Sequence, residues 1–302
     1  MKKLKSCNYP KPKGNTMELH DGRLLGYMEY CWHDNPESLP VILLFPGIPG
    51  SRLFSHPSIV KKTTKHKIRL FVLERPGFGL SSPQPNRKIM DWPIDVLQFL
   101  NYLNLKKVSI IGYSAGGPYA LAVAHALPQR LNRVAVISSV APHDAPNVYR
   151  EMPWAFKLAW FCTAYAPGFL RYLAKKDPKD VLSNPIGYHR LELNQQPLSD
   201  QKLLIQPDIE YMFCNSMMEI YARDQGDAEL YEYSLWGLPW GFELSNIVSD
   251  VCVWHGECDG STTPAMAKYI AEQVKCPLVI KPGYGHCLYF DVFEDVVAWS
   301  TY

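Results

Sequence analysis

Residues 108–120 read Val-Ser-Ile-Ile-Gly-Tyr-Ser-Ala-Gly-Gly-Pro-Tyr-Ala, and this stretch carries the strongest fold signal in the chain. An apolar, β-branched run leads into the pattern Gly-x-Ser-x-Gly, and an alanine-rich segment typical of a helix follows at once. At so sharp a turn, Ser114 must adopt strained backbone angles, while Gly112 and Gly116 keep its surroundings small enough to avoid collision. The stretch therefore predicts a serine hydroxyl raised above a sheet, beside a helix N-terminus that favours developing negative charge.

Short apolar runs of the same kind recur along the chain. An Asp-Gly pair at residues 21–22 lies between two strand-like runs and predicts an opening β-hairpin. Runs without polar alternation suit strands covered on both faces, and helical stretches at 95–103 and 115–126 lie between them. This order predicts an α/β fold with a mostly parallel central sheet and helices on both faces. The predicted strands are Val41–Phe45, Leu70–Leu73, Val108–Ile111, Val134–Ile137, Val251–Trp254 and Leu278–Ile280.

The alternation of strands and helices stops in the middle of the chain. Residues 143–246 are rich in Trp, Tyr, Met and Pro, with helix-like pieces at 154–173 and 208–223. A helical insertion that interrupts the sheet is the simplest account of this order. We therefore expect a core of residues 1–142 and 247–302 carrying a cap of residues 143–246, with residues 1–15 as a flexible basic tail.

Composition excludes several classes of protein. Hydrophobic residues make up 47% of the 302 residues, charged residues make up 20%, and the net charge is +2, so nucleic acid is not an expected partner. No apolar segment follows the N-terminal lysines, and residues 154–173 lack the ~20 uninterrupted apolar residues of a membrane span. The eight cysteines contain no Cys-x-x-Cys pair, which favours free thiols and a cytoplasmic location. His255 lies near Cys252 and Cys258, but no second cluster completes a metal site, so no metal is expected.

The nucleophile needs a base and an acid that orients the base. A serine hydroxyl is a weak nucleophile until a base removes its proton. His286 follows the last predicted strand in a glycine-flanked loop, and Asp259 follows the strand before it. Glu257 is a rival for the acid, whereas Asp250 precedes its strand and would lie at the wrong end of the sheet. The expected catalytic residues are therefore Ser114, Asp259 and His286, with Asp259 stabilising the imidazolium.

With these three residues in the order serine, aspartate, histidine, the chain resembles a capped member of the α/β-hydrolase fold superfamily. The resemblance covers nearly the whole chain outside the first dozen residues and the middle insertion. The supporting motifs are Pro-Gly-Ile-Pro-Gly-Ser-Arg at 46–52, Arg-Pro-Gly-Phe-Gly-Leu-Ser at 75–81, Asp-Trp-Pro-Ile-Asp at 91–95 and His-Gly-x-x-Asp at 255–259.

The resemblance also implies where an oxyanion would be held. One donor in such enzymes is the backbone N–H after the nucleophile, here that of Ala115, and the other matches Ile48. Losing one such donor typically costs about a hundred- to a thousand-fold in rate. Many relatives carry His-Gly in this loop, but this chain has Phe45-Pro46-Gly47, and Pro46 offers no N–H. We expect prolines to stiffen the loop in place of the histidine.

Aromatic side chains are candidates for the substrate pocket. We consider Tyr113, Trp154, Trp160 and Trp236 as substrate-binding residues, since such side chains line apolar pockets. Phe156, Phe161 and Tyr165 are further candidates, either for the pocket or for an entrance facing a membrane surface. The alternative is that these aromatics simply pack the cap onto the core.

The expected activity is that of a carboxylesterase-like serine hydrolase that needs no cofactor. Its substrate would be a small to medium, mostly apolar ester. A serine nucleophile weighs against dehalogenases and epoxide hydrolases, which resemble this pattern but use a carboxylate there. Thioesterase, amidase, carbon–carbon hydrolase, acyltransferase and haloperoxidase-like chemistry fit the same three residues.

Two other interpretations of the sequence stay open: a non-catalytic ligand-binding protein, and a membrane-surface lipase or acyltransferase. The oligomeric state stays open too.

Overall fold

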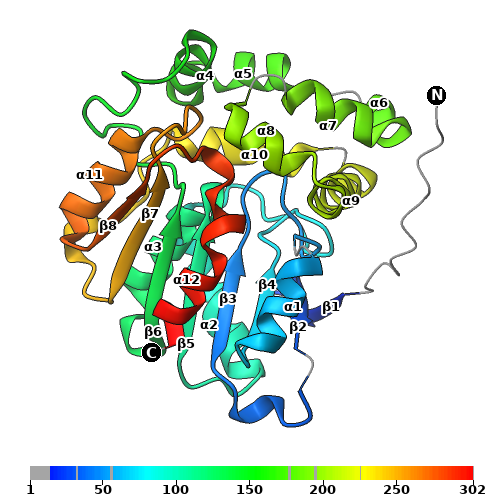
Figure 1. Ribbon diagram of the computed structural model, residues 1–302, viewed down its shortest axis with the longest axis vertical. Helices are drawn as coiled ribbons and strands as arrows, with labels where there is room; N and C mark the ends of the chain where they lie inside the picture. Colours follow the sequence, from blue (N-terminus) through cyan, green and yellow to red (C-terminus); the bar gives the residue numbers. More distant parts are fainter. Residues whose placement is uncertain are drawn as a thin grey trace.

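A twisted sheet forms the centre of the computed structural model, which describes residues 14–31, 33–54, 57–175, 178–193, 196–224 and 226–301 (Figure 1). Within those ranges the sheet has eight strands in the order β1-β2-β4-β3-β5-β6-β7-β8. The strands β1 and β2 form the expected hairpin and pair antiparallel, and β2 also pairs antiparallel with β4. Every other pair of neighbouring strands is parallel. The strands are β1 (Asn15–Glu18), β2 (Leu24–Tyr30), β3 (Val41–Phe45), β4 (Arg69–Leu73), β5 (Val108–Tyr113), β6 (Leu131–Ile137), β7 (Val251–Gly256) and β8 (Leu278–Lys281).

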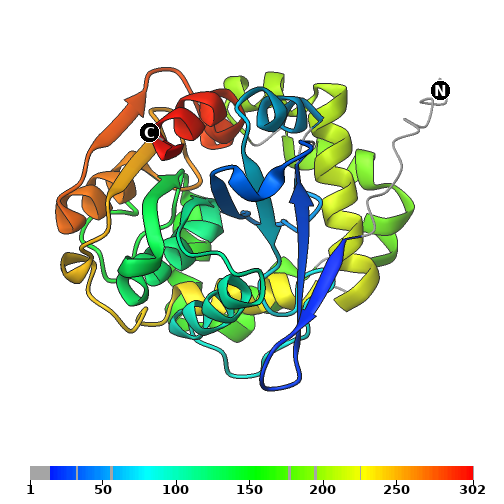
Figure 2. The ribbon, with the colours of Figure 1, turned by 90° about the horizontal axis from the view of Figure 1, so that it is seen from below.

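Helices cover both faces of this sheet, as the apolar strands predict. Along β3, Leu43 and Phe45 face one core cluster while Ile42 and Leu44 face the other, so the strand is buried on both sides. Figure 2 shows α1 and α12 on the opposite side of the sheet from α2 and α3. These helices are α1 (Pro57–Lys65), α2 (Trp92–Tyr102), α3 (Gly117–Ala126), α11 (Pro264–Val274) and α12 (Tyr289–Thr301).

A helical cap lies between β6 and β7 in the sequence and covers one end of the sheet (Figure 1). One helix was expected over 154–173, but α4 ends at Tyr165 and α5 begins at Pro167, because a proline cannot continue a helix. The flexible tail was predicted over 1–15; Asn15 instead belongs to β1, and residues 1–13 lie outside the described ranges. The cap helices are α4 (Trp154–Tyr165), α5 (Pro167–Ala174), α6 (Pro178–Ser183), α7 (Pro185–Leu193), α8 (Leu198–Leu204), α9 (Pro207–Asp224) and α10 (Asp227–Trp236).

Buried ion pairs join the cap to the core. Glu219 of α9 lies 2.8 Å from Arg52, which follows β3. Glu232 of α10 lies 3.1 Å from Arg75 and 2.5 Å from Arg87, and all three side chains are buried. Burial acts to raise the pKa of Glu232, but the two guanidinium groups hold it below its ordinary value. Removing Glu232 would leave two buried guanidinium groups without their carboxylate, so its pairs fix α10 to the core. Arg52 also pairs with Glu74 (3.0 Å), so the contact with α9 is one of two that this guanidinium makes.

Candidate active site

The nucleophile turn follows β5 as the sequence predicts. Ser114 has a φ of +53° and opens a short 3-10 turn, Ser114–Gly116, that leads directly into α3. A Cβ on Gly116 would lie 2.0 Å from the carbonyl oxygen of Phe45, and one on Gly112 would lie 2.6 Å from the Ala120 side chain. Only glycine lets the turn approach β3 and α3 so closely. The strain at Ser114 is therefore held by packing on two sides.

The structure brings Ser114, His286 and Asp259 together from three separate loops. His286 Nε2 lies 2.9 Å from the Ser114 hydroxyl oxygen, and His286 Nδ1 lies 2.9 Å from Asp259 Oδ2. Ser114 follows the carboxyl end of β5, Asp259 follows that of β7 and His286 follows that of β8. All three strands are parallel to their neighbours. This is the edge of an open α/β sheet at which ligands bind.

Asp259 is buried and fully hydrogen-bonded. Its Oδ1 accepts hydrogen bonds from the N–H groups of Ser261 (2.9 Å) and Thr262 (3.0 Å), and its Oδ2 accepts one from the Thr262 hydroxyl (2.8 Å). Burial acts to raise the pKa of Asp259, but the His286 ring and these donors hold it below its ordinary value. The carboxylate is therefore kept ionised and correctly turned towards the imidazole.

The two rival acids lie elsewhere. Glu257 is exposed and accepts a hydrogen bond from the N–H of Gly283. Asp250 pairs with Arg133 at 3.1 Å, before β7 begins. Neither carboxylate contacts the imidazole of His286 in the described structure.

A second carboxylate, supplied by the cap, holds the backbone of the histidine loop. Asp200 of α8 is 2% exposed; its Oδ2 accepts a hydrogen bond from the His286 N–H (2.7 Å) and its Oδ1 accepts one from the Cys287 N–H (3.1 Å). A Cβ on Gly285 would lie 2.4 Å from this carboxylate, so the loop fits against it only with glycine there. Burial raises the pKa of Asp200. Sequence reasoning missed this residue, because nothing near position 200 points to a loop 86 residues away.

The pKa of His286 reflects both carboxylates. Burial acts to lower the pKa of the imidazole, but Asp259 and then Asp200 favour the protonated ring, and the pKa lies above its ordinary value. An imidazole in this setting is a stronger base than one in water.

The loop that carries Ile48 is fixed by a buried arginine. Arg75 donates hydrogen bonds to the carbonyl oxygens of Pro46 (2.5 Å) and Gly47 (3.4 Å). The same guanidinium is paired with Glu232 of the cap. Stiffening by prolines was the only device expected from the sequence; the guanidinium is an additional one that the sequence analysis missed. Ala115, the other expected N–H donor, is buried in the turn after the nucleophile.

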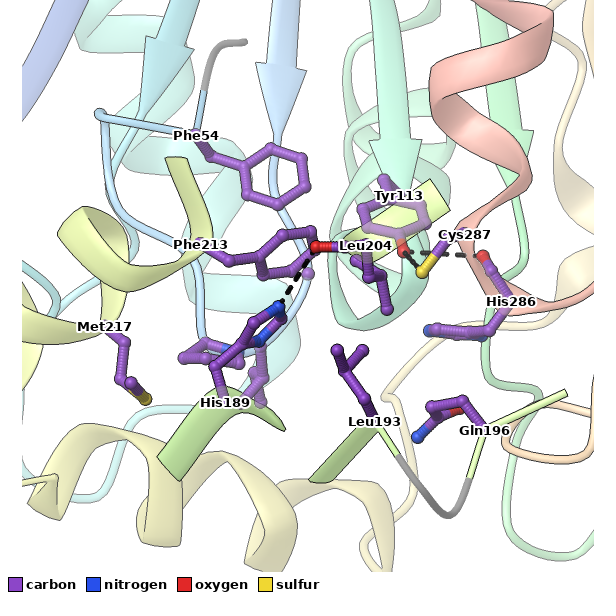
Figure 3. A pocket seen from close by; sticks show the side chains of 13 residues that line it. Phe54, Tyr113, His189, Leu193, Gln196, Leu204, Phe213, Met217, His286 and Cys287 are labelled. Carbon is purple, nitrogen blue, oxygen red and sulfur yellow. Dashed lines mark hydrogen bonds between the residues drawn. The ribbon is translucent and has the colours of Figure 1, made fainter. Parts of the chain in front are cut away.

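Two cavities share His286, Ile48 and Pro49 in their walls. The larger has a volume of about 410 Å³ and is lined by Ser114 and His286 together with Phe156, Trp160 and Trp236. The smaller has a volume of about 120 Å³ and includes Tyr113. Figure 3 shows Tyr113 and His286 on one side of the smaller cavity and the rings Phe54 and Phe213 on the other.

Trp154, expected to bind substrate, does not line either of these cavities. Its side chain is 79% exposed, and Phe161 and Tyr165 are also exposed. The prediction for Trp154 is wrong. Apart from Lys157 and Thr163 the residues of α4 are apolar or weakly polar on all sides, so its sequence does not reveal which stripe faces inwards.

The residues considered for a metal site have other roles. His255 Nε2 lies 2.7 Å from the carbonyl oxygen of Thr262, Cys252 is buried in the core, and Cys258 is exposed. Within the described ranges no three His, Cys, Asp or Glu side chains gather as a metal site would require. The cysteines that the structure describes are free thiols, and Cys7 lies outside them.

Comparison with known proteins agrees with this architecture. A family model described as the alpha/beta hydrolase fold matches residues 40–292. A curated relative, the dihydrolipoyllysine-residue acetyltransferase component of the acetoin cleaving system of Pseudomonas putida, is 31% identical over 191 residues, which are 61% of this chain and 48% of that protein. The 2-hydroxy-6-oxo-2,4-heptadienoate hydrolase of Pseudomonas putida is 26% identical over 121 residues, 39% of this chain and 43% of that protein. The chain thus spans about half the length of these curated relatives.

Solved structures are similar over almost the full length. The epoxide hydrolase VrEH1 of Vigna radiata superposes with a TM-score of 0.67 at 16% identity, covering 95% of this chain and 96% of that one. At this identity the likeness concerns the fold alone.

Proposed function

Because the chain belongs to the alpha/beta hydrolase fold family, we propose that it is a serine hydrolase that cleaves carboxylic esters of small to medium, mostly apolar substrates. The observation that carries this proposal is the hydrogen-bonded series from Ser114 through His286 to Asp259, with 2.9 Å at each step. A nucleophile within reach of a base, and a base oriented by a third group, is the arrangement that activates a serine.

Each residue would take one role in acyl transfer. Ser114 Oγ attacks the ester carbonyl carbon, and its proton passes to His286 Nε2. Asp259 stabilises the imidazolium, while the N–H groups of Ile48 and Ala115 donate hydrogen bonds to the oxyanion. His286 then returns the proton to the departing alkoxide, and water releases the acyl group by the same steps in reverse. These groups suffice without a cofactor.

The cavity supports an apolar substrate. Phe156, Trp160 and Trp236 supply rings around the space of about 410 Å³ in front of the serine. The serine nucleophile weighs against epoxide hydrolysis, because a carboxylate takes that place in the epoxide-hydrolase branch. Hydrolysis of an ester requires only the proton transfers that His286 can perform.

Labelling with a fluorophosphonate, read by intact mass and peptide mapping, tests the proposal directly. We expect one adduct on Ser114, turnover of soluble esters, and a loss of turnover of about 10⁶-fold in Ser114→Ala. The matched control is Ser38→Ala, which changes an exposed serine of the core. Wild-type turnover in Ser114→Ala would refute the assignment. A folded protein that takes no label but is thermally stabilised by ester analogues would favour a binding protein instead.

A further inference from the structure

Helices α4 and α5 form the wall between the larger cavity and the outside. Phe156, Ala159, Trp160 and Thr163 recur at helical spacing on one side of α4 and line the cavity, and Leu170 continues this lining on α5. In Figure 1 both helices lie at the top of the cap, on its outer side. What binds to their other side would therefore lie within one helix diameter, about 10–12 Å, of the site.

That other side is an exposed apolar surface, here called the outer aromatic face. Trp154, Leu158, Phe161 and Tyr165 form one stripe along α4, with exposed fractions of 79%, 45%, 55% and 69%. A helix that is apolar all round is normally buried, so the exposure of this stripe requires an explanation. On α5 the face continues through Phe169, Tyr172 and Leu173.

The charged residues within and directly after α4 and α5 are all basic. Lys157, Arg171 and Lys175 are exposed, and no acidic residue occurs in the sequence from Trp154 to Lys175. Lys157 lies on the face itself, whereas Arg171 lies at its edge and also borders a cleft that Asp227 lines. None of the three basic side chains is held in an ion pair with another described residue. Large aromatic side chains set among lysine and arginine are typical of helices that lie in the headgroup region of a membrane.

We infer that the outer aromatic face docks on the surface of an anionic lipid bilayer and holds the catalytic cavity against it. The aromatic rings enter the headgroup layer, and the three basic side chains meet negatively charged lipid headgroups. No helix in the described part of the chain is long and apolar enough to cross a membrane, so the contact is peripheral. Resting on the proposed function, the inference adds that the ester substrate enters from the lipid layer.

The charges distinguish a bilayer from a second copy of the chain. A symmetric dimer through this face would place the patch against itself, so that Lys157, Arg171 and Lys175 of one copy approach the same cations of the other. Such an interface would also contain no acidic side chain from α4 or α5 to balance them. An anionic surface satisfies both the apolar and the charged side chains.

Co-sedimentation with lipid vesicles tests the docking without relying on catalysis, since Ser114→Ala protein can be used. We expect binding to vesicles containing phosphatidylserine to exceed binding to pure phosphatidylcholine vesicles. It should weaken between about 0.1 M and about 1 M salt, as the Debye length falls from about 10 Å to about 3 Å. Reversing the charge of Lys157, Arg171 and Lys175 to glutamate should reduce the affinity by more than about a hundredfold, because the loss of each positive charge alone costs about fivefold. The matched control reverses Lys106, Lys268 and Lys275, exposed lysines of the core.

The apolar part of the face is tested separately. Phe161→Ser with Tyr172→Ser should lower vesicle binding, whereas Ile94→Ser with Tyr102→Ser, equally exposed on α2, should not. Equal binding to neutral and anionic vesicles, or no effect of the charge reversal, would overturn the inference. So would a concentration-dependent dimer in solution that the Phe161 and Tyr172 changes abolish.

The failure of this inference is distinguishable from the failure of the proposed function. Turnover of a soluble short ester depends on the serine and histidine but not on the outer aromatic face. Absent turnover with intact vesicle binding would therefore count against the hydrolase alone. Normal turnover without vesicle binding would count against the docking alone.

Discussion

Asp200 is the cap residue that holds the backbone of His286, so replacing it by asparagine measures how much the cap contributes to the catalytic base. The substitution keeps the shape of the side chain but leaves one oxygen where two accepted hydrogen bonds, from the N–H groups of His286 (2.7 Å) and Cys287 (3.1 Å). One buried N–H then faces an amide NH₂, and an unsatisfied buried donor costs about 1–3 kcal/mol. We expect this cost to destabilise the conformation in which His286 contacts Ser114, so that kcat drops by roughly 5- to 150-fold.

The pH profile separates this positioning role from a loss of stability. The base must be neutral to accept a proton, so activity rises with pH through the pKa of His286, which lies above its ordinary value. Asp200 contributes to that increase, and removing its charge should lower the pKa. The acid limb of kcat/KM should therefore move to lower pH in Asp200→Asn, measured on a soluble short ester.

Asp180→Asn, an exposed aspartate of α6, is the matched control and should leave the profile unchanged. Asp200→Glu restores the charge and should return the acid limb towards its original position. An unchanged acid limb and kcat in Asp200→Asn, with only a lower melting temperature, would show that Asp200 merely holds the cap. The coupling between Asp200 and the imidazole of His286 would then be refuted.

Substitutions at three further residues, with Glu257→Gln as a control, test other parts of the site. Asp259→Asn should keep the protein folded and lower kcat by about 10⁴-fold, whereas Glu257→Gln should keep nearly full turnover; the opposite result would move the acid. Arg75→Met should lower the free energy of unfolding by about 3–5 kcal/mol in a denaturant titration, because Glu232 loses a buried partner. It should also slow turnover through the loop of Ile48 by up to about a hundredfold, and an unchanged kcat would remove Arg75 from the oxyanion argument. Trp160→Ala should widen the cavity and shift the preference of kcat/KM towards longer acyl chains; an unchanged order across a chain-length series would place the substrate elsewhere.

The parts of the fold that follow from the sequence are those written in short stretches. The turn around Ser114 requires glycine at fixed positions, so residues 112–116 alone predict its strain and its place between β5 and α3. The hairpin, the strands and the break between core and cap follow from equally local patterns. The proximity of His286 and Asp259 can be predicted because the loops that follow parallel strands lie at the same edge of the sheet.

The parts that could not be predicted depend on contacts between distant segments. Asp200 and Arg75 act on loops far from them in the chain, through backbone groups that carry no residue-specific signal. Trp154 and Trp160 lie on the same helix, and only their positions around its axis distinguish them. Because the apolar residues of this helix are not confined to one face, the sequence does not show which tryptophan faces the cavity. The structure turns one outwards and the other into the cavity wall.

The ion pairs of the cap have a consequence for how this protein can diverge. Glu232 is buried between Arg75 and Arg87, so a change at this position alone leaves two buried guanidinium groups without their carboxylate, and α10 resists it. In the part of the chain that the structure describes, α4 and α5 carry no such pair. Substitutions in α4 and α5 therefore break no ion pair to the core, although the same two helices line the cavity. A library of variants confined to residues 154–174 is therefore the shortest route to new substrate selectivity on this scaffold.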